Sequence, residues 1–409
     1  MNNNQKKICA IICEYNPLHN GHAYLINKAK ELTGCDFVMA IMSGNFTQRA
    51  EPAILNKYRR ATLALDSNVD IVVQIPTAYA CGSSEIFAKA GVSIADSFKN
   101  VSHLLFGSEC GDLQQLNKCA EFFINEPKEY SNMLKALLKE GNSYNSSRLK
   151  VIEKMVELNK LDASFLETVS QPNNILAIEY IKQLKQLKSS IVPVTCKRIG
   201  EDYNSKNFNE FASASTIRNL LLGKDIKDTK KAIPEGIYDN YKKAIEKQGI
   251  YNLKMFNDFL LMAMRNTTPE QLSNIFEVKD GFEKRLIAMS QKAIDYPSFV
   301  ESVKTKAISE KKINKIALYN ILGINKEIIS LLYKKPLPYI KVLASKKPVL
   351  NYTQTSSTLL LRSQDTKKLN GKFVDALLSI ENKAENIYSY LNNDKIVSLP
   401  YLVQAPILI

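Results

Sequence analysis

Short apolar runs alternate with helix-length stretches through the first half of the chain, and this alternation limits the possible folds more than any other feature. Five runs of this kind are found at 8–13, 37–42, 71–75, 101–106 and 191–196. A continuous apolar run is typical of a strand that is buried on both faces. The chain is therefore predicted to form an α/β fold built on a doubly wound, Rossmann-like parallel sheet.

The intervals between these runs are long enough for the crossovers that parallel strands require. The first three hold candidate helices at 21–32, 57–66 and 83–97. The fourth interval is too long for one crossover. Its residues 112–170 are rich in Leu, Lys and Glu, and we expect an inserted set of helices there, followed by a helix at 172–187.

The character of the sequence changes between residues 223 and 236, where Lys and Asp alternate and a Pro-Glu-Gly turn follows. We place a domain boundary there. Residues 1–225 are predicted to be the sheet domain, and 235–409 a mainly helical second domain. Apolar runs at 339–343, 359–361 and 396–403 leave room for a small sheet near the end of the chain.

Positive charge is concentrated in the second half. The chain has a formal charge of +14, and residues 301–350 hold eleven lysines against three glutamates. Such a concentration favours a polyanionic partner, because neutralising phosphates releases condensed counterions. The alternative is an ordinary solvated surface that is rich in lysine.

The cysteine pattern points to a reducing compartment. Seven cysteines are scattered along the chain, and none are spaced as CxxC. A disulfide framework or a structural zinc site is therefore not expected. The chain has no apolar run long enough to cross a bilayer, and the run at 8–13 continues into Glu14 without a cleavage site. We expect a cytoplasmic protein with no membrane association.

Two histidines follow the first apolar run, at the point where a doubly wound sheet binds ligands. His19, Gly21 and His22 form an HxGH motif at the start of a helix, and Pro17 fixes the preceding turn. Gly21 allows a base or phosphate to approach closely, and the imidazoles can donate hydrogen bonds to phosphate oxygens at a helix N-terminus. The alternative is that two histidines lie in one loop by coincidence.

A second candidate phosphate-binding segment lies at 211–218. Ser213 and Ser215 can donate hydrogen bonds to the β- and γ-phosphates, and Arg218 adds positive charge near a helix N-terminus. The serines could instead be helix caps.

Both segments resemble the HxGH nucleotidyltransferase superfamily, whose second signature has the form S-S-T-x-I-R. Ala214 stands where that signature often has a hydroxyl residue. Class I aminoacyl-tRNA synthetases share the first motif but carry a KMSKS-type loop, and no such loop occurs here. The first domain is thus expected to be a nucleotidyltransferase domain with His19, His22 and Arg218 as catalytic residues.

Further segments, at 42–49, 51–53, 106–109 and 171–176, resemble the bacterial tRNA(Met) cytidine acetate ligase family. That resemblance implies ATP-dependent activation of acetate to acetyl-adenylate. The acetyl group then passes to the wobble cytidine of elongator tRNA(Met), giving N4-acetylcytidine, with AMP and pyrophosphate released. Mg²⁺ is expected with ATP, held largely by substrate oxygens and water. No dedicated metal-binding site is expected from protein side chains.

The resemblance also implies a set of residues that contact ATP. They are Ile12, Cys13, Glu14, Tyr15, Asn16, Pro17, His19, Asn20, Gly21, His22, Leu25, Gly107, Asn173 or Asn174, and Arg198, to which the second segment adds Ser213 and Ser215. Leu18 replaces an aromatic residue that is usual in the first motif.

Several of these assignments have structural alternatives. Asn173 and Asn174 could cap the helix that follows Pro172, and Arg198 could form a surface salt bridge. Three polar residues after the second run, Ser43, Asn45 and Arg49, are candidates for lining an acetate or cytidine pocket.

The basic second domain is predicted to bind tRNA, because loop bases are commonly held by aromatic stacking beside basic groups. The candidate surface consists of Tyr319, Tyr333 and Tyr339 with Lys315, Lys326, Lys334, Lys335 and Lys341. Any of these tyrosines could instead belong to a helical core.

Two other functions remain open from the sequence. One is an adenylyltransferase that acts on a small phosphorylated metabolite, and the other is a catalytically idle RNA-binding protein. The clustered lysines argue against the first and the intact His19, His22 and Arg218 against the second. The sequence does not indicate an oligomeric state.

Overall fold

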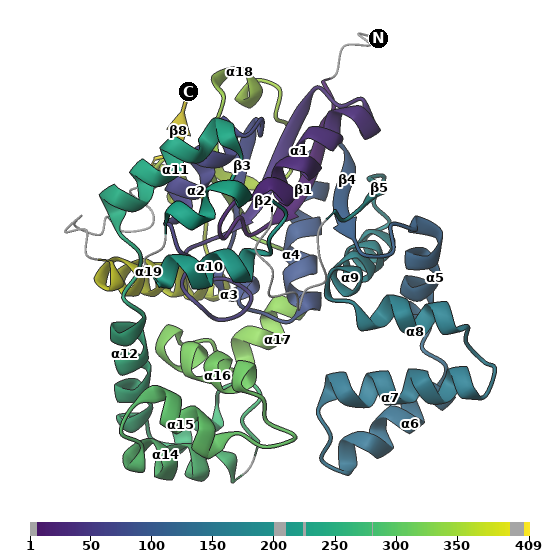
Figure 1. Cartoon of the computed structure of the whole chain (residues 1–409), viewed down its shortest axis with the longest axis vertical. Helices are drawn as coiled ribbons and strands as arrows, with labels where there is room; N and C mark the ends of the chain where they lie inside the picture. Colours follow the sequence, from purple (N-terminus) through teal and green to yellow (C-terminus); the bar gives the residue numbers. More distant parts are fainter. Residues whose placement is uncertain (1–5, 200–209, 224–225, 280, 393–404) are drawn as a thin grey trace.

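The computed structural model describes residues 6–199, 210–223, 226–279, 281–392 and 405–409. They form a mixed sheet in the order β5-β4-β1-β2-β3-β6-β7, with β8 paired to β6 (Figure 1). The first five strands are parallel: β1 (Ile8–Cys13), β2 (Phe37–Ser43), β3 (Ile71–Ile75), β4 (Val101–Ser108) and β5 (Val192–Lys197). The chain winds outward from β1 in both directions, so the predicted doubly wound α/β class is confirmed.

Helices cover both faces of this sheet, because the strands are apolar on both sides. They are α1 (Asn20–Thr33), α2 (Lys57–Asp66), α4 (Ser84–Ser97) and α9 (Pro172–Leu187), while the short helix α3 (Thr77–Ala80) follows the carboxyl end of β3 and packs against α4. Asn56 and Ser83 cap the N-termini of α2 and α4 by accepting hydrogen bonds from the backbone N–H of Arg59 and Ile86. These caps fix where each helix begins after its strand.

Four helices lie between β4 and α9: α5 (Leu113–Ile124), α6 (Lys128–Lys139), α7 (Tyr144–Glu157) and α8 (Ala163–Ser170). In Figure 1, α6 and α7 extend from the lower right of the molecule, away from the sheet. An aromatic cluster holds this layer together, with Phe122 and Phe123 against Tyr130 and Phe165.

A helical lobe lies beyond the carboxyl ends of the strands (Figure 1). It consists of α12 (Leu253–Arg265), α13 (Pro269–Ser273), α14 (Phe282–Lys292), α15 (Tyr296–Val303) and α16 (Glu310–Leu322). The segment before it contains α10 (Ala214–Leu222), η1 (Lys227–Ala232) and α11 (Glu235–Gln248), and α17 (Lys326–Lys334) leads back to the sheet.

The end of the chain returns to the main sheet. β6 (Tyr339–Ser345) pairs antiparallel with β3, while β7 (Thr358–Leu360) and β8 (Ile407–Leu408) pair with β6. The small separate sheet considered for this region is therefore not formed by the first two apolar runs. All seven residues of β6 are buried, and joining β3 satisfies a sheet edge that would otherwise be open. The third run, at 396–403, lies outside the described residues.

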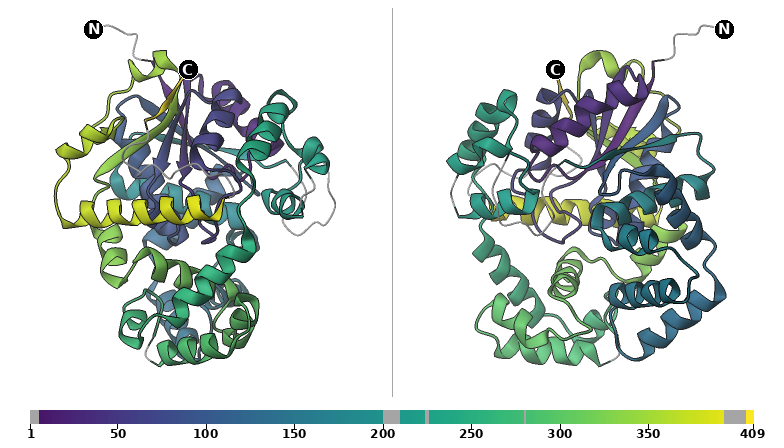
Figure 2. Two further views of the ribbon diagram at one scale, coloured as in Figure 1. Left: turned by 90° about the vertical axis from the view of Figure 1, so that its left-hand side faces the viewer. Right: turned by 45° about the vertical axis from the view of Figure 1, so that its right-hand side comes forward.

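The remaining elements are α18 (Lys347–Leu350), η2 (Ser363–Lys368) and α19 (Lys372–Leu391). The long helix α19 crosses the carboxyl end of the sheet, as the left view of Figure 2 shows, and it packs against α3. Segments from both halves of the sequence thus build the edge at which the candidate site lies.

Candidate functional site

The two histidines of the HxGH motif lie in the loop from β1 to α1 and are stacked on each other. Their ring centroids are 3.8 Å apart, and the ring of Tyr15 contacts His22 edge-on at 5.1 Å. His19 is the N-cap of α1, and its Nδ1 accepts a hydrogen bond from the N–H of Gly21 at 3.1 Å. Nδ1 of His22 accepts from the N–H of His19 at 3.4 Å.

These hydrogen bonds determine the tautomer of each imidazole. A neutral imidazole has one protonated nitrogen, and both Nδ1 atoms act as acceptors. The protons of His19 and His22 therefore lie on Nε2. Both rings can donate a hydrogen bond from Nε2 to an anionic oxygen without first being charged.

Burial keeps both rings neutral. It lowers the pKa of His19 from 6.5 to about 3, with further lowering by the nearby Arg198 and Arg218. The pKa of His22 also lies well below its ordinary value, because of burial and the proximity of His19 and Arg198. Positive charge at this site at neutral pH therefore comes from arginine.

The depressed pKa of His19 predicts acid sensitivity. Between pH 6.5 and about 3 the folded state binds fewer protons than the unfolded state, so the stability present above pH 6.5 is lost as pH falls. At pH 5 this histidine alone should cost roughly 2 kcal/mol. We expect His19→Asn, which retains a capping oxygen, to lose less of its thermal midpoint between pH 7 and pH 5 than the parent. Equal acid sensitivity of the two proteins in thermal melts would contradict this account.

Arg218 is brought to the HxGH loop by α10. It is 9% exposed, and its Nη1 donates to the carbonyl oxygen of Asn16 at 2.9 Å. Ser213 caps α10, since its hydroxyl accepts from the N–H of Thr216 at 3.2 Å, which is the structural alternative considered for it. Ser215 is half-buried and lies beside Arg218 in the lining of a cavity.

Gly107, Arg198 and Asn173 form the other side of the site, at the ends of β4 and β5. A side chain at position 107 would place its Cβ 3.2 Å from Cγ of Arg198, so glycine lets the arginine lie across the strand end. Nη1 of Arg198 donates to Oδ1 of Asn173 at 3.4 Å. The side chains of both residues therefore lie along the same sheet edge.

The neighbouring asparagine has a different setting. Asn174 is buried, and its Oδ1 accepts from the backbone N–H of Glu109 and Cys110, while its Nδ2 donates to Thr168. Glu109 in turn accepts from the N–H groups of Asn173 and Asn174, which caps α9. Asn173 is only half-buried: its Nδ2 donates to Oε1 of Glu109 at 2.7 Å, and its Oδ1 accepts from Arg198, so it is the one of the pair that lies beside Arg198.

The other predicted contacts differ in what their side chains do. Asn20 donates to the carbonyls of Glu210 and Lys231, which ties α1 to the segment carrying Arg218. Oδ1 of Asn16 accepts from the N–H of Ile54. Cys13, Tyr15 and Pro17 are buried, Glu14 and Leu25 are half-buried, and Ile12 packs against α4 at Gly91. Their contacts with ATP remain predictions.

Sequence reasoning missed Arg60, which holds two loops of the site together. This residue is 1% exposed and donates to the carbonyls of Leu55, Glu14 and Gly44. It therefore joins the loop after β1 to the loop after β2. The sequence gives little signal for it, because α2 has charged residues at 57, 59 and 60, and only the structure shows that Lys57 and Arg60 are buried.

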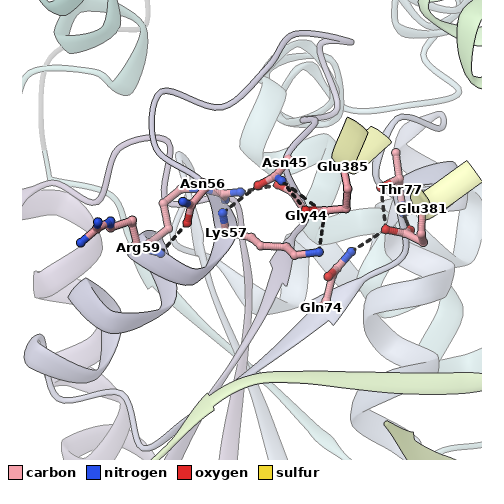
Figure 3. Close-up of polar contacts among 10 residues, drawn as sticks. Gly44, Asn45, Asn56, Lys57, Arg59, Gln74, Thr77, Glu381 and Glu385 are labelled. Carbon is pink, nitrogen blue, oxygen red and sulfur yellow. Dashed lines mark hydrogen bonds and ion pairs between the residues drawn. The ribbon is translucent and has the colours of Figure 1, made fainter. Parts of the chain in front are cut away.

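A buried polar cluster lies beneath the loop after β2, and it too was not foreseen (Figure 3). Nζ of Lys57 forms an ion pair with Oε1 of Glu385 at 2.5 Å, and Nδ2 of Asn45 donates to both carboxylate oxygens at 3.2 Å. One turn earlier on α19, Glu381 accepts from the Gln74 amide and from the backbone and hydroxyl of Thr77. Burial raises the pKa of the Glu381 carboxyl to about 7.

The contacts in this cluster also bear on the prediction that three residues after β2 line a substrate pocket. The side chain of Asn45 is engaged by Glu385 and by the N–H of Lys57, so the prediction that it lines an acetate or cytidine pocket is not supported. Ser43 is fully buried. Arg49 is half-buried and lines the same cavity as Ser215 and Arg218.

The predicted aromatic and basic surface for RNA is only partly exposed. Tyr319, Tyr339 and Lys341 are each at most 1% exposed, and Lys315 donates to the carbonyl of Gly82 beneath the lobe. The prediction that Tyr319, Tyr339 and Lys341 face RNA is wrong, because packing in the lobe and in β6 buries them. Lys315 is half-buried, and its ammonium group is engaged by the carbonyl of Gly82. Tyr333, Lys326, Lys334 and Lys335 are exposed on or next to α17.

Two further features of the described residues concern metal binding and membranes. The described residues contain no group of three or more His, Cys, Asp or Glu side chains arranged to hold a metal ion. Among the helices of the described ranges, none is both long and apolar enough to span a membrane.

The chain is similar to known proteins over almost its whole length. The HIGH Nucleotidyl Transferase family matches residues 6–399. The tRNA(Met) cytidine acetate ligase of Clostridium perfringens (strain ATCC 13124) is 37% identical, covering 98% of this chain and 99% of that protein. The protein of the same name from Thermoanaerobacter sp. (strain X514) is 41% identical over 323 residues, 78% of this chain and 79% of that one. The crystal structure of Thermotoga maritima TmcAL bound with alpha-thio ATP superposes with a TM-score of 0.91 at 27% identity, covering 98% and 99% of the two chains.

Proposed function

The chain belongs to the HIGH Nucleotidyl Transferase family and to the family of tRNA(Met) cytidine acetate ligases, and from this we propose that it is an ATP-dependent ligase that acetylates the wobble cytidine of elongator tRNA(Met). The product is N4-acetylcytidine. The observation that carries the proposal is the stacked pair His19 and His22, with two arginines beside it, at the carboxyl edge of the sheet. We place the protein in the cytoplasm, where its tRNA substrate is found.

We propose that the first half-reaction forms acetyl-adenylate. A carboxylate oxygen of acetate bonds to the α-phosphorus of ATP, and the bond from that phosphorus to the bridging oxygen breaks. The electron pair leaves with pyrophosphate. The Nε2–H groups of His19 and His22 would stabilise negative charge on the phosphate oxygens, and Arg198 and Arg218 would add fixed positive charge. These groups lie ready in a partly buried site, which reduces reorganisation during the reaction.

Mg²⁺ is proposed to accompany ATP and to neutralise charge on the phosphates when bound. Since the described chain offers no cluster of metal-ligating side chains, phosphate oxygens and water would supply most of its ligands. The protein's own contribution is then to orient the triphosphate.

In the second half-reaction the exocyclic nitrogen of the cytidine takes the acetyl group and AMP is released. A free amine of an aromatic base is a weak nucleophile, so the mixed anhydride supplies the good leaving group that acetate lacks. The remaining tasks of the protein are alignment of the attack and exclusion of water.

The exposed lysines next to α17 are proposed to bind the tRNA backbone, and this predicts a change in salt dependence. Replacing Lys334 and Lys335 by glutamine should weaken tRNA binding and lower the slope of log Kd against log salt by roughly 0.7 to 0.9 for each phosphate that is no longer neutralised. ATP–pyrophosphate exchange should stay unchanged. The matched control pair is Lys99, which precedes β4, and Lys347, which follows the antiparallel strand β6; both are exposed near the amino ends of the parallel strands. An equal reduction of the slope in both double variants would exclude a specific role for the first pair.

One assay tests the proposed function against its two rivals. The protein is incubated with ATP, labelled acetate and total tRNA, and label is measured in RNA. Label in RNA at cytidine supports the ligase. Pyrophosphate release that needs a phosphorylated metabolite instead of acetate supports an adenylyltransferase, and a protein that binds RNA without ATP turnover is the idle scaffold.

A further inference from the structure

A cavity of about 350 Å³ lies between the sheet domain and the helical lobe. Its walls are the loop 49–52 after β2, the exposed side of α10, and the helices α12, α15 and α16. The volume suits a nucleoside, since small-molecule sites begin at roughly 300 Å³. The cavity is thus large enough for one base with its sugar but not for a duplex.

Aromatic side chains form one part of the lining. Tyr251, Phe256 and Tyr296 are each 4% to 5% exposed, so their rings are held in place by the lobe. The hydroxyl of Tyr296 donates to Oδ1 of Asn314 at 3.0 Å, which orients the amide of Asn314 in the same lining. The part of each ring that remains exposed can contact a single-stranded base at little cost in conformational entropy, because the ring is already held in place.

Three of the polar groups in the lining can match the edge of a cytosine, while two further carboxylates, Glu301 and Glu310, lie in the part formed by α15 and α16. Within the described ranges, the carboxylate of Glu51, the amide of Asn257 and Nδ2 of Asn314 make no hydrogen bond to the protein. Cytosine offers a donor at N4 and acceptors at N3 and O2. A carboxylate accepts from N4, and amide N–H groups donate to N3 and O2. Uracil, with an acceptor at position 4, would face the Glu51 carboxylate unfavourably.

The cavity shares a wall with the nucleotide site. Ser215 and Arg218 line the cavity, and Arg218 also donates to the carbonyl of Asn16 in the HxGH loop. Arg218 and Arg49 both interact electrostatically with Glu14, and Tyr251 with Glu51 and Arg218. A group bound in the cavity therefore lies next to the residues proposed to hold the phosphates.

From this geometry we propose that the cavity is the binding site of the acceptor base, which must leave the anticodon stack to enter it, and that Glu51 recognises its exocyclic amine. The inference rests on the proposed function, because it assigns the second substrate of the same reaction. The exposed parts of the rings would contact the base. Asn257 and Asn314 would donate hydrogen bonds to N3 and O2, and Arg49 would contact the phosphate of the nucleotide.

With these groups in place, each bond and proton of the acetyl transfer is accounted for. The lone pair of the exocyclic nitrogen forms a bond to the acetyl carbon, and the bond from that carbon to the phosphate oxygen breaks with its electrons on AMP. The nitrogen loses one proton, which the Glu51 carboxylate accepts. Glu51 is thus proposed to be a catalytic residue, and Asn257 a specificity residue.

Binding of two RNA hairpins tests the cavity without any chemistry. The probes are the anticodon stem-loop with cytidine at the wobble position and the same stem-loop with uridine, measured by fluorescence with full-length protein. We expect the parent to prefer cytidine by about tenfold, the equivalent of one or two hydrogen bonds. Glu51→Gln and Asn257→Leu should reduce that preference to less than about threefold. Equal binding of the two hairpins by the parent, or an unchanged preference in both variants, would overturn the proposal.

Acetyl transfer supplies a second readout. Glu51→Gln should lower transfer to tRNA by about 100-fold, as expected for loss of a general base, while acetate-dependent ATP–pyrophosphate exchange without RNA stays within about twofold. Glu270→Gln on α13, exposed in the same lobe, is the matched control and should change neither reaction. A parallel fall of both reactions in Glu51→Gln would place Glu51 outside the acceptor site. If the parent protein prefers the cytidine hairpin but transfers no labelled acetate to tRNA, the proposed function is wrong. The assignment of the cavity as a cytidine-binding site would still be supported.

Discussion

Replacing His22 by alanine is expected to lower acetate-dependent ATP–pyrophosphate exchange by roughly 100- to 1,000-fold, the usual effect of removing one donor to a developing anion. The imidazole of His22 is neutral, and its Nδ1 already accepts from the backbone of His19. The alanine variant therefore lacks the Nε2–H group that would donate a hydrogen bond to the phosphates. The alanine variant also lacks the ring that stacks on His19 at 3.8 Å.

The control for this variant is the third histidine of the chain. His103 lies near the start of β4, away from the carboxyl edge, where its Nδ1 is within 2.9 Å of the hydroxyl of Ser102. His103→Ala should leave exchange unchanged. Binding of tRNA by His22→Ala should stay within about twofold of the parent, because the lobe and its lysines are untouched. Exchange that survives in His22→Ala would refute the role assigned to the HxGH loop.

Replacing Lys57 by methionine is expected to reduce the free energy of unfolding by about 3 to 5 kcal/mol. Lys57 is fully buried and pairs with Glu385, which is 5% exposed (Figure 3). Removing the ammonium group leaves the buried Glu385 carboxylate without its ion-pair partner, while an electrostatic interaction with Lys341 remains. Urea unfolding followed by circular dichroism measures the loss.

Two further variants make this result specific to the buried pair. Lys57→Met combined with Glu385→Leu removes both charges, and its cost should be clearly smaller than the sum of the two single substitutions. Lys154 and Glu157 form an exposed pair on α7, with side chains 55% and 64% exposed. Breaking that pair should cost less than about 1 kcal/mol. If Lys57→Met costs no more than the exposed control, the cluster does not hold α19 to the sheet.

The position of this cluster connects stability to function. Asn45 and Lys57 flank the loop that carries Arg49 and Glu51, while Glu381 and Glu385 come from α19 near the other end of the chain. The cluster therefore fixes one wall of the cavity. A variant that loosens it should weaken acceptor binding even though none of its members meets the base.

Much of the fold could be predicted because it depends on local pattern. Apolar runs gave all five parallel strands to within two residues at each end, since residues buried on both faces of a sheet are apolar along their whole length. The helix limits 57–66 and 172–187 agree with α2 and α9, because Asn56 caps the first and Pro172 begins the second. Interactions of this kind reach only a few residues along the chain.

The edge of the sheet could not be predicted in the same way. β6 is an apolar run like the others, and nothing within it specifies an antiparallel pairing with β3, more than 260 residues earlier. The same limit explains the wrong surface assignment of Tyr319 and Lys341. A tyrosine or lysine is amphipathic, so only its tertiary partners decide whether it is buried.

The sequence by itself determined the parallel sheet, the position of the HxGH loop at its carboxyl edge, and the residue types available there for phosphate chemistry, because these follow from local periodicity and motif spacing. The tertiary structure decided which of them work together. It alone shows that Nδ1 of His19 and of His22 accepts a backbone hydrogen bond, that Asn174 is buried in its loop while Asn173 contacts Arg198, and that Arg218 also lines a cavity. Burial and contacts between residues far apart in the chain set these properties, and no short stretch of sequence contains them.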